Sequence, residues 1–229
     1  MAIKKDSITD FSDSDFCILG CGRFGRIALA ELTRPYPTAH IRVIDCKPLK
    51  DIPENIEVIT CDAVEWLARF CTSDVADTVI IPALPIHLAA EWLKKKLTEQ
   101  QAEVNTINIS PDLLGGLPNP LHLKEGQIAI SYADFICPSN CPEPESTCTY
   151  TGKPRPTPLY TVLQKADVGA DKTYVIRSQQ IAPGVGGFRA EVLLNLFNDI
   201  KKISEGTLYI GTTCKCHGIV DRLYYSLMS

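Results

Sequence analysis

The sequence lacks any apolar run close to the ~20 residues that a membrane-spanning helix requires. Residues 1–15 contain two lysines followed by acidic residues and serines, without the apolar stretch of a secretory signal peptide. We therefore expect a cytoplasmic protein with no membrane insertion. Basic residues are not in excess, because 23 Lys and Arg stand against 27 Asp and Glu. This balance argues against nucleic acid as a partner.

Several common catalytic signatures are also missing. The sequence contains no Ser–His–Asp signature, no P-loop, no HExxH motif and no internal repeat. Its 45% hydrophobic and 22% charged residues are typical of a globular protein and exclude a disordered chain, collagen and a coiled coil. At roughly 150 residues per domain, the chain forms one large domain or two small ones.

Charge is distributed unevenly along the chain. Residues 1–150 carry 13 Lys and Arg against 21 Asp and Glu, a net charge of −8, whereas residues 151–229 carry 10 against 6, a net charge of +4. The positive C-terminal part favours a small anionic ligand, although an excess of this size is also common on an ordinary solvated surface.

Short apolar segments alternate with helical patterns between residues 15 and 110. This alternation is typical of parallel strands joined by crossover helices. We therefore predict the α/β class, with a Rossmann-type doubly wound parallel sheet. The strands are predicted at 16–19, 41–44, 56–59, 78–81 and 106–109, and the helices at 23–32, 63–70 and 87–97.

The pattern changes after residue 110. A Gly/Pro loop is followed by a segment at 127–135 that we expect to extend the same sheet as a sixth strand, and residues 137–158 are too rich in Pro, Cys and Thr to be regular. A small α+β module then has strands at 173–181, 207–212 and 219–225 and helices at 159–165 and 187–201. The predicted domains are 1–136, which binds NAD(H), 137–158, a Cys/Pro-rich metal or cluster loop, and 159–229, the α+β module.

A Gly-x-Gly-x-x-Gly motif lies between the first predicted strand and the first predicted helix. In a dinucleotide-binding fold, its glycines allow a tight turn, close approach of a pyrophosphate and close helix packing, and the N–H groups at the helix start bind the pyrophosphate. Asp45 ends the second strand 20 residues after Gly25, where a carboxylate accepts from ribose hydroxyls and favours NAD(H) over NADP(H). The alternative is a glycine turn that binds nothing. The motif residues expected at NAD(H) are Gly20, Cys21, Gly22, Arg23, Phe24 and Gly25.

The segments ILGCGRFGRIALAEL, VID and CDA resemble the NAD-binding TrkA-N or RCK domain of potassium-transport regulators. This resemblance covers about residues 15–100, and it implies that Asp62 and Ala63 border the adenine. The chain departs from that family where residues 82–87 replace its Thr/Asp-rich segment and where its C-terminal ligand-binding domain has no recognisable counterpart. Regulation of a potassium channel is therefore not carried over.

Ten cysteines are many for a chain without a secretory signal, and in a reducing compartment they remain thiols, bind metal or carry out redox chemistry. Five lie in apolar patterns of the first third and are expected in the core. The others are surrounded by polar residues and prolines and offer the four thiolates of an iron–sulfur cluster, or the thiolate and imidazole ligands of zinc. A redox thiol pair and purely structural thiols are the alternatives. The expected ligands are Cys137, Cys141, Cys148, Cys214, Cys216 and His217.

Two further features are candidates for the substrate side of the site. A second glycine-rich segment is expected to form an anion-binding nest at a helix start, or else a simple turn. His87 follows the fourth strand at the carboxyl edge of the sheet, where it is a candidate general acid or base beside a nicotinamide, although a lone histidine is more often structural. The residues of the second segment are Gly184, Gly186, Gly187 and Arg189.

The sequence thus predicts a cytoplasmic NAD(H)-binding protein of the oxidoreductase type, with a cysteine-ligated metal or iron–sulfur site at the domain junction. The C-terminal module is expected to fold back over the nucleotide crevice. A non-catalytic nucleotide-sensing regulator related to the RCK proteins and an NAD-stabilised assembly factor are the alternatives. Turnover and homo-oligomer formation are left open.

Overall fold

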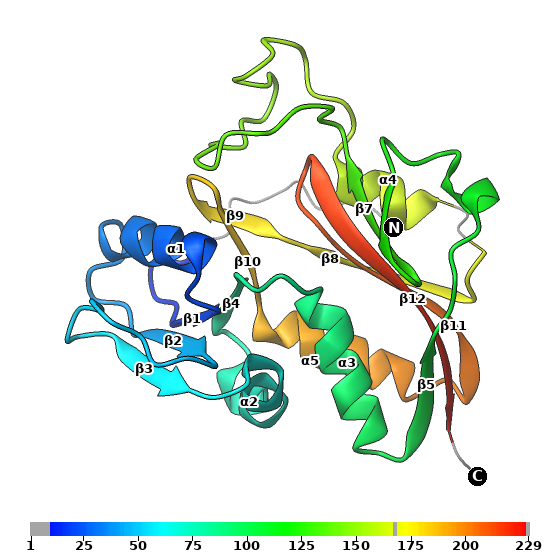
Figure 1. Cartoon of the computed structure of the whole chain (residues 1–229), viewed down its shortest axis with the longest axis horizontal. Helices are drawn as coiled ribbons and strands as arrows, with labels where there is room; N and C mark the ends of the chain where they lie inside the picture. Colours follow the sequence, from blue (N-terminus) through cyan, green and yellow to red (C-terminus); the bar gives the residue numbers. More distant parts are fainter. Residues whose placement is uncertain (1–9, 167–168, 228–229) are drawn as a thin grey trace.

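The computed structural model describes residues 10–166 and 169–227 and has an α/β fold with two mixed sheets (Figure 1). Residues 1–9, which belong to the predicted first domain, lie outside the described residues. Within the described ranges, no helix has the length and apolar character needed to cross a membrane.

The first sheet contains the four parallel strands that the sequence predicts. Their spatial order is β3-β2-β1-β4, and β1 is buried along its whole length, as expected for a parallel strand covered on both faces. The strands are β1 (Phe16–Leu19), β2 (Ile41–Asp45), β3 (Glu57–Thr60) and β4 (Val79–Pro82). The helices are α1 (Arg23–Thr33), α2 (Ala63–Phe70) and α3 (Leu88–Thr98), with a 3₁₀ turn at Ser73–Val75.

The predicted fifth and sixth strands belong to the other sheet, so placing them in the parallel sheet was wrong. Strand β5 (Ala102–Thr106) and the hairpin of β6 (Leu121–Lys124) and β7 (Gln127–Ser131) follow α3, with a 3₁₀ turn at Pro111–Leu114 between them. Burial varies from residue to residue along β5, which suits an antiparallel strand with one covered face. The predicted boundary at residue 136 therefore does not coincide with the division between the sheets.

The second sheet is organised around its longest strand, β12 (His217–Leu227). This strand pairs along its length with β11 (Glu205–Thr213), while β7 and β5 pair with successive parts of its other edge. Strand β8 (Lys172–Arg177) runs parallel to β11. Helix α4 (Leu159–Lys165) buries Leu159 and Leu163 against Tyr209 and Val220 of this sheet.

Between β8 and β11 the chain returns to the first sheet. Strand β10 (Val185–Arg189) pairs antiparallel with β4, and β9 (Gln179–Ala182) pairs with β10 at the sheet edge. Helix α5 (Ala190–Ile200) starts three residues later than predicted. The predicted single strand at 173–181 is thus two strands in different sheets, and residues 159–229 are not a separate module.

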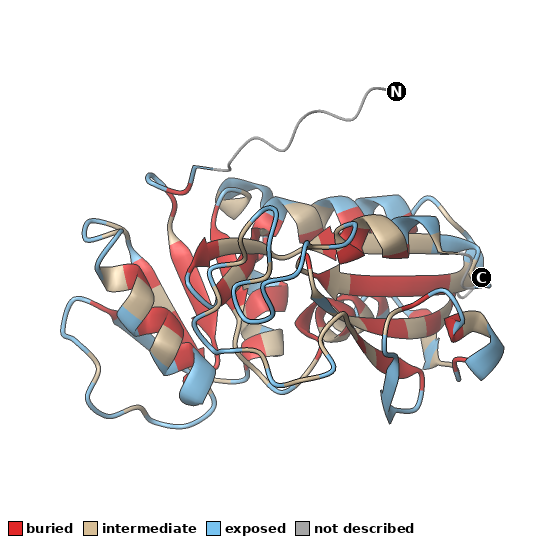
Figure 2. Ribbon diagram, turned by 90° about the horizontal axis from the view of Figure 1, so that it is seen from above, coloured by how far each residue is buried: buried red, intermediate tan, exposed pale blue. Residues whose placement is uncertain are grey.

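One cluster of buried side chains joins the two sheets. It runs from Leu19 and Ile80 of the first sheet through α3 and α5 to Ile210 and Leu223 of the second. Buried residues accordingly line the strands of both sheets, while the outer loops are exposed (Figure 2). The position of the second sheet is therefore fixed by apolar packing as well as by the chain connection.

Gly187 allows β10 to pack closely on β4. A methyl group at this position would lie 2.6 Å from the carbonyl oxygen of Ile80 and 2.8 Å from Ile181 Cδ1. We expect Gly187→Ala to lower the free energy of unfolding in urea by about 2 kcal/mol, because of overpacking. Gly116→Ala, at a site with open space, is the control and should change it by less than about 0.5 kcal/mol. Equal effects would contradict the close packing of β10.

Candidate functional site

The first and third glycines of the N-terminal motif are required by the backbone geometry. Gly20 has a φ of +95°, and a side chain there would lie 2.8 Å from the carbonyl oxygen of Ala83. A Cβ at Gly25 would lie only 2.0 Å from the carbonyl oxygen of Gly20, so α1 packs directly against its own loop. A Cβ at Gly22 would meet nothing within 4 Å. The loop is thus closely packed on one side and open at its centre.

The start of α1 is available to a ligand. Gly22 is the N-cap residue and no side chain caps the helix, while Arg23 and Phe24 are exposed. The free N–H groups of such a helix start carry partial positive charge. An anionic group above Gly22 would therefore be stabilised.

Asp45 is held against this loop by its own hydrogen bonds. Its carboxylate accepts from the N–H of Cys21 at 2.7 Å and from the N–H of Lys47 at 2.9 Å. Partial burial alone would raise the pKa of Asp45, but these N–H donors outweigh burial and lower the pKa below its ordinary value. Asp45 is thus a charged group beside the start of α1.

Asp62 and Ala63 lie at the carboxyl end of β3, next to Asp45 in the sheet. The Asp62 carboxylate accepts from the N–H groups of Val64 and Glu65, both at 2.9 Å, and so caps α2. Ala63 is buried. The side chain of Asp62 therefore has a structural function in addition to its predicted place near the adenine.

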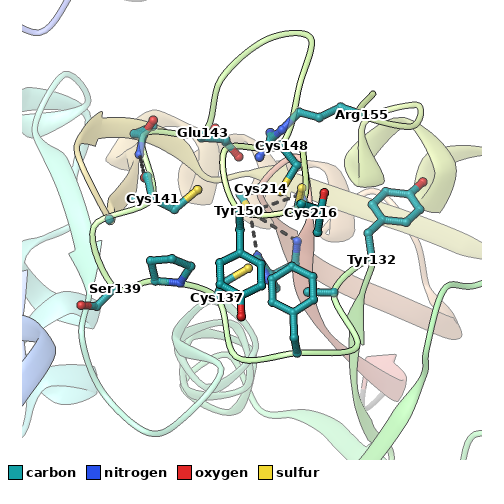
Figure 3. A pocket seen from close by; sticks show the side chains of 18 of the residues that line it. Tyr132, Cys137, Ser139, Cys141, Glu143, Cys148, Tyr150, Arg155, Cys214 and Cys216 are labelled. Carbon is teal, nitrogen blue, oxygen red and sulfur yellow. Dashed lines mark hydrogen bonds between the residues drawn. The ribbon is translucent and has the colours of Figure 1, made fainter. Parts of the chain in front are cut away.

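A cavity of about 640 Å³ lies beside the glycine loop, between α1, the segment 132–158, the β9–β10 turn and the β11–β12 turn (Figure 3). Its walls bring together all six of the predicted metal ligands, although they come from segments about seventy residues apart. Phe24 of the glycine motif lines the same cavity. The cavity-lining residues among the predicted ones are Phe24, Cys137, Cys141, Cys148, Gly184, Gly186, Cys214, Cys216 and His217.

The β11–β12 turn holds Cys214 by hydrogen bonds to its sulfur. The N–H groups of Cys216 and His217 donate to Cys214 Sγ at 3.4 and 3.3 Å, and the N–H of Cys214 donates to the carbonyl of His217 at 2.9 Å. The Nδ1 atom of His217 is 3.8 Å from the same sulfur. Backbone donors around a sulfur stabilise negative charge on it, as in a thiolate ligand.

Cys148 has a similar turn on the opposite segment. The N–H of Gly152 donates to the carbonyl of Cys148 at 2.9 Å. Hydrogen bonds from the Thr151 hydroxyl, and from the N–H groups of Thr151 and Tyr150, lower the pKa of the Cys148 thiol. The Cys148 thiol therefore ionises more readily than an ordinary cysteine.

The pKa values of three other cavity thiols, those of Cys137, Cys214 and Cys216, are shifted in the opposite direction. Withdrawal from water raises the pKa of Cys214 to about 12. Burial, followed by the neighbouring thiolates of Cys141 and Cys148, raises the pKa of Cys137. Burial, followed by the charge of Glu143 and then by the neighbouring thiolates, raises the pKa of Cys216, against an opposing effect of Arg155. Thiols that raise one another's pKa lie close enough to interact, and a bound cation would remove their mutual repulsion.

The thiols share a cavity but do not form a closed coordination site. Among residues 10–166 and 169–227, no three Cys, His, Asp or Glu side chains are arranged to hold a metal ion. The segment 132–158 and the β11–β12 turn are nonetheless connected. The N–H of Lys215 donates to Glu143 Oε1 at 2.7 Å, and the ammonium group of Lys215 pairs with Glu145. Side-chain rotation within this frame would be needed to bring four ligands together.

The second glycine-rich segment only partly occupies its predicted place. Gly184 and Gly186 line the cavity, and the N–H of Gly184 donates to the carbonyl of Cys141 at 3.1 Å. Gly187 lies inside β10, and Arg189 points to the other end of the strand, where it donates to the carbonyl of Asp77 at 2.8 Å. The expected helix-start nest is therefore wrong, because these residues form a strand.

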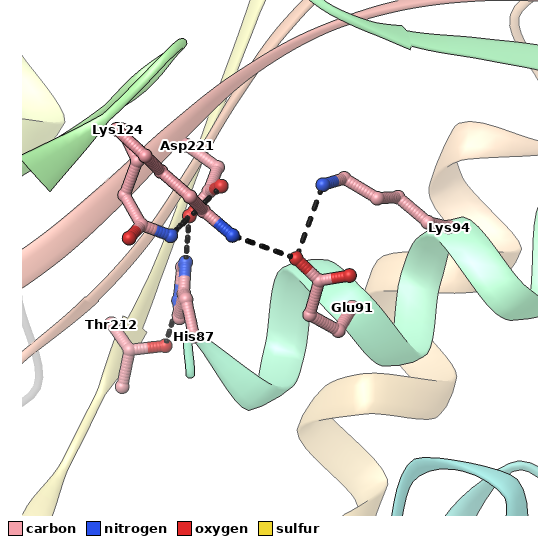
Figure 4. A network of polar contacts seen from close by, with 7 residues as sticks. His87, Glu91, Lys94, Lys124, Thr212 and Asp221 are labelled. Carbon is pink, nitrogen blue, oxygen red and sulfur yellow. Dashed lines mark hydrogen bonds and ion pairs between the residues drawn. The ribbon is translucent and has the colours of Figure 1, made fainter. Parts of the chain in front are cut away.

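His87 lies in a buried polar network between the two sheets (Figure 4). Its Nδ1 is 2.6 Å from Asp221 Oδ2 and its Nε2 is 2.8 Å from Thr212 Oγ1. Gln127 donates to both oxygens of Asp221 at 3.1 and 3.0 Å. The side chains of His87 and Asp221 are 2% and 0% exposed, so this geometry gives His87 a structural function, and its acid–base role stays a prediction.

Sequence reasoning missed Arg155, which also lines the cavity. The Nε and Nη1 atoms of this residue are buried without a hydrogen-bond partner among the described residues. One signal was present in the sequence, because Arg155 stands between Pro154 and Pro156, which restrict its backbone.

Comparison with known proteins places most of the chain in one family. Residues 89–226 match the AF_1314_C family model, described as "Uncharacterized protein, C-terminal domain". An "Uncharacterized protein" of Archaeoglobus fulgidus is 29% identical over 148 residues, which cover 63% of this chain and 64% of the relative. The match thus spans less than two thirds of that relative's length. No solved structure is significantly similar.

The matched region begins within α3, so it contains the second sheet and the cavity cysteines but not the glycine motif. The name of neither the family nor the relative states an activity. The arrangement of the side chains must therefore support any functional conclusion.

Replacing His87 by alanine tests the buried network. His87→Ala leaves the Asp221 carboxylate with the Gln127 amide alone, and we expect the free energy of unfolding in urea to fall by about 3 kcal/mol. His122→Ala is the matched control, because His122 is exposed on β6 and should change stability by less than about 0.5 kcal/mol. Similar stability of both variants would contradict a structural role for His87.

Proposed function

This chain belongs to the AF_1314_C family, and we propose that it is an NAD(H)-binding redox protein whose cavity thiols hold an iron–sulfur cluster or a zinc ion. One observation carries the proposal: Phe24 of the glycine motif lines the same cavity as the five C-terminal cysteines. A nucleotide on the motif and a thiol-bound centre in the cavity would therefore be neighbours.

The loop geometry supports the nucleotide. In the Rossmann-type arrangement that we propose for the parallel strands, the pyrophosphate lies over the central glycine and the helix start. Gly22 has open space where that group must approach, and α1 has no side-chain cap. Asp45 would accept from the ribose hydroxyls with its remaining lone pairs. Its negative charge would repel a 2′-phosphate and so favour NAD(H) over NADP(H).

The donor set supports a thiol-bound centre. Cys137, Cys141 and Cys148 from one segment, with Cys214, Cys216 or His217 from the turn, offer the ligands that zinc and iron–sulfur clusters take. The hydrogen bonds around Cys148 would stabilise it as a thiolate, and the N–H groups around Cys214 would offset part of the effect of its burial. An iron–sulfur cluster supplies one-electron transfer when bound, whereas zinc would join the segment to the turn.

The rest of the cavity would control access to this centre. Phe135 and Tyr150 stack with ring centroids 4.4 Å apart, and both rings line the wall. Lys215 connects the segment to the turn through Glu143 and Glu145. These contacts would keep the thiols near the nucleotide and limit the water around them.

Anaerobic purification of the whole chain tests the proposal as a unit. We expect metal, or iron with acid-labile sulfide, together with bound or added NAD(H). Nucleotide binding by a protein whose ten thiols are all free would instead favour the nucleotide-sensing regulator. Absence of nucleotide and metal binding would refute both functions.

Two glycine variants should separate nucleotide binding from folding. We expect Gly22→Val to reduce NADH affinity at least about tenfold, because its side chain occupies the pyrophosphate position, while leaving the urea unfolding curve unchanged. Gly25→Ala should instead destabilise the protein, because its methyl group would lie 2.0 Å from the carbonyl oxygen of Gly20. Unchanged NADH binding by Gly22→Val in a fluorescence titration would contradict the predicted pyrophosphate position.

Metal content should depend on the cavity thiols alone. We expect Cys148→Ser and Cys214→Ser each to reduce the metal bound per chain by more than half, because serine replaces a thiolate ligand poorly. Cys46→Ser is the matched control, because Cys46 is exposed, which corrects the expected core position, and does not line the cavity. Elemental analysis of the three variants purified under the same anaerobic conditions is the measurement. An equal metal content in all three would rule out the cysteine-ligated site.

A further inference from the structure

Arg155 is a charged group in the cavity whose hydrogen-bonding capacity is unused. Its Nε and Nη1 atoms are buried and have no hydrogen-bond partner among the described residues. The backbone is held in place, because the N–H of Arg155 donates to the carbonyl of Ser146 at 2.9 Å and prolines flank the residue. Buried N–H donors without partners are costly, so such a group points to a missing acceptor.

Within residues 10–166 and 169–227, no acceptor forms a hydrogen bond with these two nitrogen atoms. Figure 3 shows Arg155 directed toward the cysteines, and its charge lowers the pKa values of Cys148 and Cys216, although other effects on these thiols are larger. Sulfur is a weak hydrogen-bond acceptor. Glu143 also lines the cavity, but its Oε1 accepts from the N–H of Lys215 at 2.7 Å. An acceptor supplied by a ligand would complete the site.

We infer that the cavity binds a small carboxylate-bearing molecule, and that Arg155 recognises its carboxylate next to the thiols. A guanidinium carries a fixed positive charge and coplanar N–H donors, which form strong charge-assisted hydrogen bonds to carboxylate oxygens. The volume of about 640 Å³ lies in the range of small-molecule sites and far exceeds that of a metal ion. The cavity volume thus suits a small molecule, and the unused donors suit a carboxylate on that molecule.

The aromatic walls provide the second half of such a site. Phe24 and Tyr150 line the cavity and are each 60% exposed. Exposed aromatic rings at the rim of a cavity favour the apolar part of a ligand. Phe24 also places this ligand next to the glycine motif. A carboxylate-bearing molecule at this position would be the substrate of the proposed redox function, and this assignment rests on that function. Binding of the molecule itself requires neither nucleotide nor metal.

Alkylation with a charged and a neutral reagent tests this recognition. Iodoacetate and iodoacetamide both transfer a two-carbon group to a thiolate with release of iodide, but only iodoacetate carries a carboxylate. The thiolate fraction affects both rates equally, so the iodoacetate-to-iodoacetamide rate ratio reports carboxylate recognition. The whole chain, reduced and freed of metal and nucleotide, is alkylated, and each cysteine is followed by peptide mass spectrometry. Exposed Cys46 serves as an internal reference because it lies outside the cavity.

We expect the rate ratio at Cys148 to exceed that at Cys46 by about tenfold, since charge-assisted hydrogen bonds are strong. Arg155→Gln should bring the two ratios together, and Arg155→Lys, which keeps the charge but not the coplanar donors, should retain only part of the difference. Lys153→Gln is the matched control, because Lys153 is an exposed cation of the same lining and should change the ratio less than twofold. Urea unfolding checks that each variant is folded.

Three results would overturn the inference. They are equal ratios at Cys148 and Cys46 in the wild type, an equal loss in Lys153→Gln and Arg155→Gln, and no reaction of any cavity thiol while Cys46 reacts. A protein that binds neither NADH nor metal can still show the expected ratio. Failure of the proposed function and failure of this inference are therefore distinguishable.

Discussion

The pairing of β10 with β4 is the constraint on which the arrangement of this molecule depends. Phe188 lies opposite Ile80 in that ladder, and the N–H of Ala190 extends the connection to the carbonyl of Thr78. Because β8 and β11 on either side of β9 and β10 belong to the second sheet, the chain leaves the second sheet for the first after β8 and returns to it at β11. The crossing fixes the β9–β10 turn beside α1, and the cavity forms where this turn meets the segment 132–158 and the β11–β12 turn.

The parallel half of the fold was predictable because its strands are short, mainly apolar runs and its loop contains a glycine motif. Strand β10 was not, because VGGFR reads as a turn and becomes a strand only against the edge of β4. The strand expected at 106–109 forms at Ala102–Thr106, where alternating burial indicates a different sheet. Sequence patterns indicate which segments are extended, but they do not indicate with which strand, or in which sheet, each segment pairs.

The candidate site shows the same division. Cysteines among prolines and polar residues were unlikely core residues, and their placement in one cavity follows that expectation. His87 is where the spacing suggested, after β4, but its burial depends on Asp221, 134 residues away. No local pattern reports such a partner. Arg155 was overlooked because the feature that distinguishes it, a set of unused donors, exists only once the surrounding atoms are placed.

The carbonyl of Cys141 accepts hydrogen bonds from both the N–H of Gly184 and the side-chain amide of Gln180. A Cβ at Gly184 would lie 1.7 Å from the carbonyl oxygen of Ser139, so this end of the segment is in van der Waals contact with the turn. The part that carries Cys148 and Arg155 is closed instead by a bridge within itself, between Thr147 and Pro154. The segment 132–158 is therefore fixed to the β9–β10 turn near Cys141 and to the β11–β12 turn through Glu143, whereas the part that carries Cys148 and Arg155 is held by hydrogen bonds within the segment itself.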